Sequence, residues 1–149
     1  RLRLIFRLYT EDWGWSVKER IKESFPNINF DINSNYYNLL LNASLVICDM
    51  DNTTLLEGLS INVPSIIFLN EKHVEFRKNV VPFYDRLGKV GILHNTPESA
   101  AKKVNEVAEN PGDWWSQSKI QEVRNLYCNQ FIRTSEDWLA EWSAELLKD

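Results

Sequence analysis

Apolar residues along this chain of 149 residues fall into short strand-like runs separated by helical spacings. Residues 1–8 alternate between leucine or phenylalanine and mostly basic residues, and this period of two predicts a strand. Ser16 and Glu19 have the spacing of a capping box, so we expect a helix that begins there and runs to about Ser24.

Two shorter elements are expected before the centre of the chain. Residues 28–30 predict a short strand, and residues 36–41 predict a helix. In that helix we expect Tyr37, Leu40 and Leu41 to face inward.

The centre of the chain carries the most informative pattern. Residues 45–48 are a continuous apolar run, as expected for a strand buried on both faces of a parallel sheet. A polar turn at 49–52 leads into a predicted helix over 53–60, which residues 62–64 (Asn-Val-Pro) end. Residues 65–69 predict a second buried strand, so the whole stretch predicts a parallel β-α-β unit.

Further elements follow in the same alternation. A short segment lies around residues 83–87, and residues 90–93 predict a third strand. Pro97 suits the first position of a helix that is capped by Asn95 or Thr96 and runs to about residue 109. Strands that alternate with helices predict an α/β fold with a doubly wound parallel sheet.

The C-terminal tail, residues 113–149, is helical by pattern, with a break near residues 133–135. Because a tryptophan is most simply a packing residue, we expect Trp114, Trp138 and Trp142 to pack in the core or at an interface.

Composition narrows the classes of protein. The chain has 17 Lys and Arg against 21 Asp and Glu, a net charge of −4, and 44% apolar residues. The apolar content excludes disorder along most of the chain, and the charge excludes the usual basic DNA-binding module, so no nucleic acid is expected as a partner. No run of about 18 apolar residues predicts a transmembrane segment. Cys48 and Cys128, far apart in sequence, are expected to be free thiols in a reducing, cytoplasmic compartment.

The turn after the first central strand is the candidate ligand site. Ligands of open parallel sheets bind where strands end and helices begin, and the helix start at Asn52, Thr53 and Thr54 offers N–H groups and hydroxyls that suit a phosphate or diphosphate. Glu57, one turn later, could accept hydrogen bonds from ribose hydroxyls. The alternative, equally open, is that Asn52 or Thr53 only caps the helix and Glu57 is a solvated acid.

Other polar residues follow predicted strands. His73 and Arg77 are four apart and would share one face if helical, where they could contact a donor or an acceptor; the alternative is a surface pair. Asp49 and Asp51 could also contact a donor or an acceptor. Arg7 ends the first strand on the same sheet edge and could bind a phosphate, or instead form a salt bridge. With two histidines in the chain we expect no zinc site.

One short stretch resembles the phosphatases of the haloacid-dehalogenase type. The apolar strand followed by Asp49-Met-Asp51-Asn-Thr53 fits their Asp-x-Asp-x-Thr motif. This resemblance implies that Asp49 is a nucleophile, Asp51 a general acid or base, and Mg²⁺ the metal. The match covers about nine residues, and no later strand ends in Ser or Thr or leads into an acidic pair.

A second resemblance covers far more of the chain. Residues 42–49, 54–59 and 63–68, followed by 91–101, look like the nucleotide-sugar-binding C-terminal half of GT-B-type glycosyltransferases. More narrowly, four motifs resemble a family of predicted bacterial surface-carbohydrate transferases, and more distantly the glycerophosphotransferases that make teichoic-acid chains: Arg7-Leu-Tyr, Asn52-Thr-Thr, Lys72-His-Val-Glu-Phe-Arg77 and Trp114-Trp115.

This resemblance implies a Rossmann-like domain over residues 1–112, with C-terminal helices over 113–149 packing on it as part of the same unit. The chain starts directly in a strand, so we expect that an N-terminal half of the protein is missing. That half would supply the catalytic base, and the piece alone would bind donor weakly and turn nothing over. The catalytic residues themselves stay unknown.

The resemblance also implies site roles. Thr53 and Thr54 would meet the donor diphosphate, with Asn52 beside them, and Glu57 would bind the ribose; no cofactor and no metal are implied. The family's Gly-rich turn is replaced by Asp49-Met-Asp51-Asn. Two acids would repel a diphosphate unless a cation or proton intervenes. The donor could therefore be CMP-linked or otherwise less charged.

We therefore expect a transferase that moves a sugar or sugar-like unit from a nucleotide-activated donor to a surface glycan. Its location would be cytoplasmic, with peripheral association at the inner membrane face left open. Two alternatives remain: the haloacid-dehalogenase-type phosphatase with Asp49 and Asp51, and a non-catalytic α/β module that binds a nucleotide or a partner protein.

Overall fold

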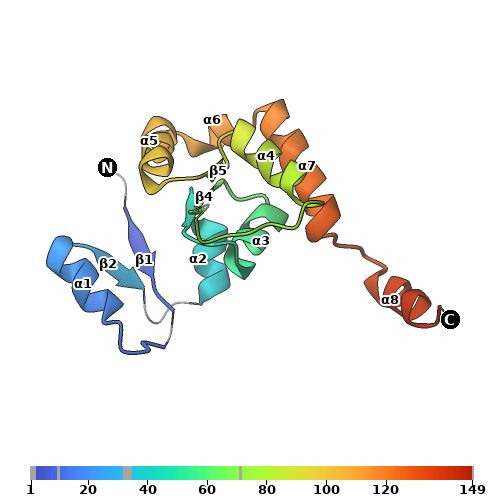
Figure 1. The fold of residues 1–149 in the computed structure, drawn as a ribbon, viewed down its shortest axis with the longest axis horizontal. Helices are drawn as coiled ribbons and strands as arrows, with labels where there is room; N and C mark the ends of the chain where they lie inside the picture. The colour runs from blue at the N-terminus through green and yellow to red at the C-terminus, as the bar shows by residue number, and fades with distance from the viewer. Residues whose placement is uncertain (1–2, 10, 32–34, 71, 149) are drawn as a thin grey trace. The chain divides into compact units, whose positions relative to one another are not determined.

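The chain forms two compact units, residues 1–42 and 43–149. The computed structural model describes residues 3–9, 11–31, 35–70 and 72–148, and Figure 1 traces their helices and strands along the chain. The first two residues of the predicted N-terminal strand lie outside the described residues.

The first unit is a small β-α-β arrangement followed by a helix. Its strands β1 and β2 pair in parallel, with Phe6 opposite Phe30 and their ring centroids 6.2 Å apart. The predicted order of strand, helix, strand and helix is confirmed, in elements with these bounds: β1 Ile5–Arg7, α1 Val17–Ser24, β2 Asn29–Asp31 and α2 Tyr36–Asn42.

The helix α1 begins at the predicted place, but the predicted capping box is wrong. Ser16 has a left-handed backbone with φ 48°, and its side chain caps nothing. A serine N-cap needs an extended backbone to reach the first helical N–H groups. Instead the Asp12 side chain accepts hydrogen bonds from the N–H groups of Trp15 (2.9 Å) and Ser16 (3.2 Å).

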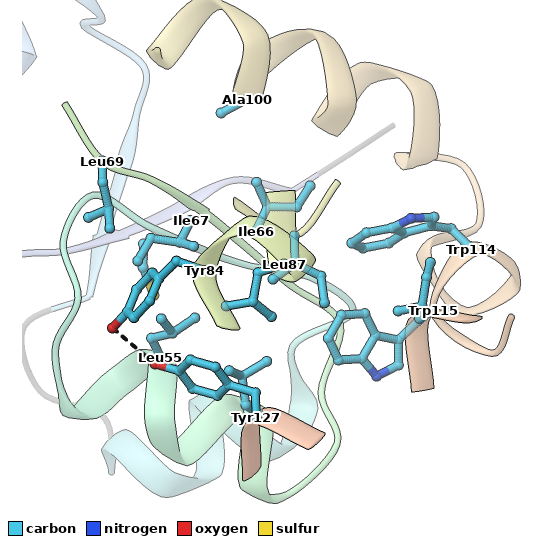
Figure 2. Packing of buried hydrophobic residues seen from close by; sticks show 14 of the residues in the cluster. Leu55, Ile66, Ile67, Leu69, Tyr84, Leu87, Ala100, Trp114, Trp115 and Tyr127 are labelled. Atoms are coloured by element: carbon cyan, nitrogen blue, oxygen red, sulfur yellow. Dashed lines mark hydrogen bonds between the residues drawn. The ribbon is translucent and has the colours of Figure 1, made fainter. Parts of the chain in front are cut away.

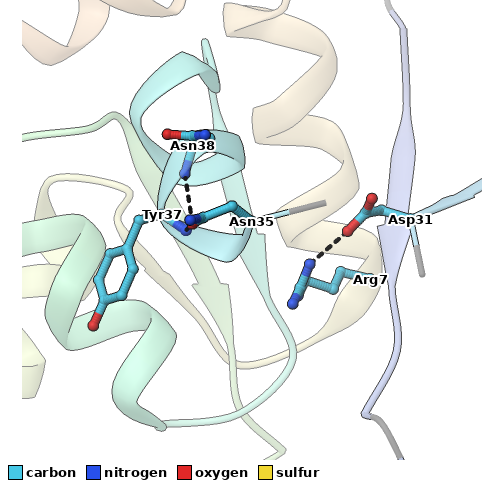
Figure 3. Close-up of polar contacts among 5 residues, drawn as sticks. All are labelled: Arg7, Asp31, Asn35, Tyr37 and Asn38. Carbon is cyan, nitrogen blue, oxygen red and sulfur yellow. Dashed lines mark hydrogen bonds and ion pairs between the residues drawn. The ribbon is translucent and has the colours of Figure 1, made fainter. Parts of the chain in front are cut away.

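The helix α2 is capped by Asn35, whose side-chain oxygen accepts from the N–H of Tyr37 (2.9 Å) and of Asn38 (3.4 Å), as Figure 3 shows. Leu40 is buried as predicted, whereas Tyr37 and Leu41 are exposed. The prediction for those two residues is wrong because apolar side chains cover a wide part of this seven-residue helix, whereas the helix buries Leu40 alone.

The second unit contains the predicted β-α-β unit at its centre. Strands β3, β4 and β5 form a parallel sheet in that order, with Ile47 opposite Ile66 and Phe68 opposite His94. The α/β class and the Rossmann-like fold are confirmed. The elements have these bounds: β3 Val46–Cys48, α3 Thr53–Ser60, β4 Ser65–Phe68, α4 Val81–Lys89, β5 Leu93–His94, α5 Pro97–Val107, α6 Pro111–Trp115, α7 Ser118–Phe131 and α8 Trp138–Leu146.

The two predicted central strands differ in burial. Ile66 and Ile67 of β4 are fully buried, because β4 has a neighbouring strand on each side. Ile47 of β3 is exposed, so the prediction that this strand is buried on both faces is wrong at that residue. The reason is position: β3 lies at an edge of its three-stranded sheet.

The third predicted strand shifts along the chain. The segment around residues 83–87 belongs to α4, Val90 is its C-cap, and Gly91 turns the chain with φ 77°. This turn delays the strand β5, which has two residues. The next helix, α5, begins as predicted, since the Thr96 side chain accepts a hydrogen bond from the Ser99 N–H at 3.2 Å.

The core of the second unit forms around β4. In Figure 2, Ile66 and Ile67 lie between Ala100 of α5 and Leu55 of α3. The helix α7 packs against both α3 and α4. Apolar burial on each side of β4 holds the sheet in place.

The tryptophans of the tail divide into two groups. Trp114 is buried in the core cluster as predicted, at 7% exposure. Trp138 and Trp142 are exposed, so neither packs in the core. Both lie on α8, which follows the predicted break and buries none of its described residues.

Two further observations concern the cysteines and the length of the helices. Cys48 and Cys128 are both free thiols, as expected. Among the described residues, no helix has the length and apolar character required to cross a bilayer.

Candidate functional site

The turn between β3 and α3 lies at the carboxyl end of a parallel strand. Asn52 is the N-cap of α3, with an extended backbone (φ −134°). Its side-chain oxygen accepts a hydrogen bond from the Leu55 N–H (3.3 Å), and its carbonyl oxygen accepts from the Leu56 N–H (3.3 Å). The Asn52 side chain therefore satisfies one of the orphan N–H groups that every helix start presents, that of Leu55, and its carbonyl begins the regular hydrogen bonding of the helix.

The next two residues keep their backbone donors available. Within the described part of the chain, no hydrogen bond engages the N–H of Thr53 or Thr54. Thr53 is exposed and Thr54 is half-buried. These N–H groups and the two hydroxyls stand at the positive end of the helix dipole, an arrangement that favours an anion.

Glu57 follows on the same helix and is half-buried. It is four residues after Thr53 and three after Thr54, so the three side chains lie on one face of α3. The helix thus presents donors at its start and a carboxylate one turn later.

The turn is tied to the core through Asp51. Tyr84 of α4 donates a hydrogen bond from its hydroxyl to Oδ2 of Asp51. The Tyr84 hydroxyl also lies 3.2 Å from the hydroxyl of Tyr127 on α7, the contact drawn as a dashed line in Figure 2. Sequence reasoning missed both tyrosines, since nothing local indicates that Tyr84 reaches a residue 33 positions earlier.

Burial keeps the groups around this turn protonated. It raises the pKa of the Tyr84 hydroxyl, and the hydrogen bond to the Asp51 carboxylate raises it further. Burial likewise raises the pKa of Tyr127 to about 12 and, with the neighbouring charges of Asp49 and Asp51, that of the Cys48 thiol to about 12. Both tyrosines are therefore hydrogen-bond donors at any physiological pH.

The residues after β4 form an irregular segment. His73 and Arg77 are exposed and lie in a segment of turns and irregular backbone, so they do not share a helical face. The His73 N–H donates to the Asn70 carbonyl at 2.8 Å, which fixes a turn there. Both residues still follow the strand next to β3.

Arg7 lies in the first unit. Its Nη1 is 2.5 Å from Oδ2 of Asp31, the residue opposite it on β2, as Figure 3 shows. The strand β1 pairs with β2 and belongs to a different sheet from β3. The expected shared sheet edge is therefore wrong, and the salt bridge that the sequence left open is present.

His94 ends β5 and is a strand-end residue that the sequence did not place in the site. Its Nε2 lies 3.1 Å from the Gly91 carbonyl oxygen and its Nδ1 lies 3.1 Å from the Ser99 hydroxyl. Burial lowers the pKa of the ring. The Gly91 carbonyl oxygen can only accept, so the Nε2–H of His94 donates to it. Nδ1 thus contacts the first turn of α5, whereas Nε2 contacts the turn before β5.

Two surface hollows lie on the helical side of the second unit. One, of about 330 Å³, is lined by residues of α4 and α7, among them Arg86 and Glu122. The other, of about 560 Å³, lies between the ends of α4, α5 and α6, around Trp114. Neither is lined by the turn at 49–54. Among the residues that the structure describes, no group of three or more His, Cys, Asp or Glu is arranged to hold a metal ion.

Comparison with known proteins gives one match. The model of a family described as LIC12162 family transferase matches residues 1–146, nearly the whole chain. Comparison with curated proteins and with solved structures gave no match.

Proposed function

The chain belongs to the LIC12162 family of transferases, and we propose that it moves a sugar or sugar-like unit from a nucleotide-activated donor to a surface glycan. The start of α3 would bind the donor diphosphate. The observation that supports this proposal is the pair of N–H groups of Thr53 and Thr54, which no hydrogen bond engages within the described residues, at a strand end of a parallel sheet.

The proposed chemistry is electrostatic. The diphosphate oxygens would accept hydrogen bonds from the N–H and hydroxyl groups of Thr53 and Thr54, with the Asn52 amide beside them. Negative charge develops on the leaving phosphate as the bond to the sugar breaks, and preorganised donors at a helix start stabilise that charge. Such stabilisation lowers the barrier to transfer without a metal.

Glu57 would select the nucleoside part of the donor. Its carboxylate lies one turn from the diphosphate donors on the same face of α3. A carboxylate at that spacing accepts hydrogen bonds from two ribose hydroxyls, as acidic residues do in other dinucleotide sites. The same proposal gives further contacts with donor or acceptor to Asp49, His73 and Arg77.

The setting of the reaction follows from this chemistry. A nucleotide-activated donor is available in the cytoplasm, so we place the protein there, with peripheral contact at the inner membrane face. The acceptor would be a growing glycan.

The test is a thermal-shift screen of the chain with UDP-, CDP-, GDP- and CMP-sugars. We expect one nucleotide class to raise Tm by several degrees at about 100 times its Kd, as ligand linkage requires. Glu57→Gln should abolish the shift, whereas Glu122→Gln, a matched change of an exposed acid on α7, should keep it. A wild-type chain that responds to none of the four classes contradicts the proposal.

The same screen tests the phosphatase alternative. If Mg²⁺ with beryllofluoride, a phosphate mimic, stabilises the chain and Asp49→Asn abolishes that stabilisation, the donor-binding proposal is wrong. In that case Asp49 would be the nucleophile of a phosphatase.

A further inference from the structure

Two carboxylates stand beside the proposed diphosphate site. Asp49 and Asp51 lie within four residues of Thr53, and both are exposed. A like charge about 5 Å from a bound anion is unfavourable even near a solvated surface. A site that binds a diphosphate here needs a device that limits this repulsion.

The hydroxyls at Asp51 form a chain with a fixed direction. A tyrosine hydroxyl carries one proton, and that of Tyr84 is donated to Asp51. The contact of 3.2 Å between the two tyrosine oxygens must then be a donation from Tyr127 to Tyr84. The chain runs from Tyr127 through Tyr84 to Asp51, and each bond polarises the next.

The chain is held rigidly. Tyr84 is 8% exposed and Tyr127 is 2% exposed. The Tyr84 ring lies against Phe76, with centroids 4.0 Å apart and planes at 30°, and meets the Tyr127 ring edge-on at 5.8 Å and 84°. This ring packing fixes the position of the Tyr84 hydroxyl. The Asp51 side chain must therefore orient towards that hydroxyl to form the hydrogen bond.

We infer that Tyr84, supported by Tyr127, is a positioning residue for the diphosphate-binding turn, acting through Asp51. Its hydroxyl holds the Asp51 carboxylate on the core side of the turn and disperses its charge into the hydrogen-bond chain. An anion at the N–H groups of Thr53 and Thr54 then meets less repulsion, because the Asp51 carboxylate is held away from it. This inference rests on the proposed function, because it concerns the same site.

A rescue experiment separates this role from a merely structural one. Tyr84→Phe keeps the ring and removes the hydroxyl, so the Asp51 carboxylate is released and can move towards the anion. We expect the affinity for the nucleotide found in the screen, and for inorganic pyrophosphate, to fall about tenfold, as a carboxylate that moves closer to the site predicts.

Asp51→Asn should restore binding in the Tyr84→Phe chain, since the repelling charge is gone. Asp51→Asn alone should bind at least as tightly as the wild type. Isothermal titration of the four proteins, each checked for an unchanged unfolding midpoint, measures the cycle. If the loss caused by Tyr84→Phe persists in the double variant, charge release is not the cause and the inference is overturned.

Tyr127→Phe is the second variant should Tyr84→Phe fail to fold. It removes the donor to Tyr84 and leaves the bond to Asp51, so we expect a smaller loss of affinity that Asp51→Asn also rescues. An unchanged affinity in Tyr127→Phe shows that Tyr127 does not support the chain.

Amide hydrogen exchange separates failure of this inference from failure of the proposed function. Tyr84→Phe should speed exchange of the Leu55 and Leu56 N–H groups, which depend on the cap at Asn52. The control is the Ala100 N–H in the first turn of α5, which should not change. Unchanged exchange at Leu55 and Leu56 overturns the inference whether or not any nucleotide binds, whereas faster exchange without nucleotide binding in the wild type overturns the proposed function alone.

Discussion

The guanidinium of Arg124 on α7 donates from Nε to the carbonyl oxygen of Leu59 at 2.6 Å, at the C-terminal end of α3. Its Nη2 also donates to the next carbonyl, of Ser60, at 3.0 Å. A cation at this end of a helix satisfies orphan carbonyls and interacts favourably with the dipole. The helix that carries the candidate site is thus held at its start by Asn52 and at its end by Arg124.

Arg124→Met should lower the free energy of unfolding by about 2 kcal/mol, because two charge-assisted hydrogen bonds are lost while the aliphatic stem is kept. Urea denaturation measures the change. Lys119→Met, at an exposed position of the same helix, is the control and should change stability by less than about 0.5 kcal/mol. Equal effects of the two substitutions would show that the contacts with α3 contribute nothing.

A second contact fixes the turn after α3. The indole N–H of Trp115 donates to the carbonyl oxygen of Asn62 (3.1 Å) and to its side-chain oxygen (2.8 Å). Asn62 has a left-handed backbone with φ 62°, as helix-ending residues often do. Trp115→Phe keeps an aromatic ring and removes the donor, so we expect a loss of stability of about 1–3 kcal/mol.

The measurement for Trp115→Phe is again the urea midpoint. Asn62→Gly supplies the comparison, since glycine accepts the left-handed backbone but loses the side-chain oxygen. It should destabilise less than Trp115→Phe, because the carbonyl oxygen at position 62 still accepts the indole. The opposite order would mean that the side-chain oxygen is the more important acceptor.

The tryptophans of the tail offer a matched pair for burial. Trp114→Ala should lower the free energy of unfolding by about 3–5 kcal/mol, as expected for a large side chain removed from a core. Trp142→Ala should change it by less than about 0.5 kcal/mol, because this side chain is 62% exposed. A large loss from Trp142→Ala in thermal or urea unfolding would show that α8 packs against something.

Stability should fall in alkaline solution. The pKa of the Cys48 thiol is raised from its ordinary value of 9.0 to about 12, and that of Tyr127 from 10.0 to about 12. Unfolding restores the ordinary values, so the unfolded chain loses these protons first. The stability that the protonated groups contribute is complete below about pH 9 and is lost as the pH rises towards 12.

Urea midpoints measured between pH 7 and pH 11 check this prediction. Cys48→Ala should make the decline above pH 9 less steep, because one group with a raised pKa is removed. Cys128→Ala is the comparison: burial raises the pKa of that thiol too, but Arg124 opposes the shift. A decline that is equally steep in wild type and Cys48→Ala would contradict the role of Cys48.

The sequence by itself determined the elements whose signals are local. The helix over residues 53–60, its stop at Asn62 and the strand at residues 65–68 follow from helical spacing, turn-forming residues and a continuous apolar run. The helix start at Pro97 is equally local, because proline and the Thr96 cap act on neighbouring N–H groups. The same local reasoning placed Asn52, Thr53 and Thr54 at a helix start.

Tertiary structure decided which strands lie at an edge, which caps form and which distant side chains come into contact. An apolar run gives no sign of whether its strand lies at an edge, as β3 does, or at the centre, as β4 does. The spacing of Ser16 and Glu19 indicated a cap that the backbone at Ser16 does not allow. The bond between Tyr84 and Asp51 joins residues 33 apart, and it forms because α4 and α7 pack where they do. Periodicity indicates which side chains of an element can face a core, whereas which of them are buried, and against what, follows only from the packing of whole helices and strands.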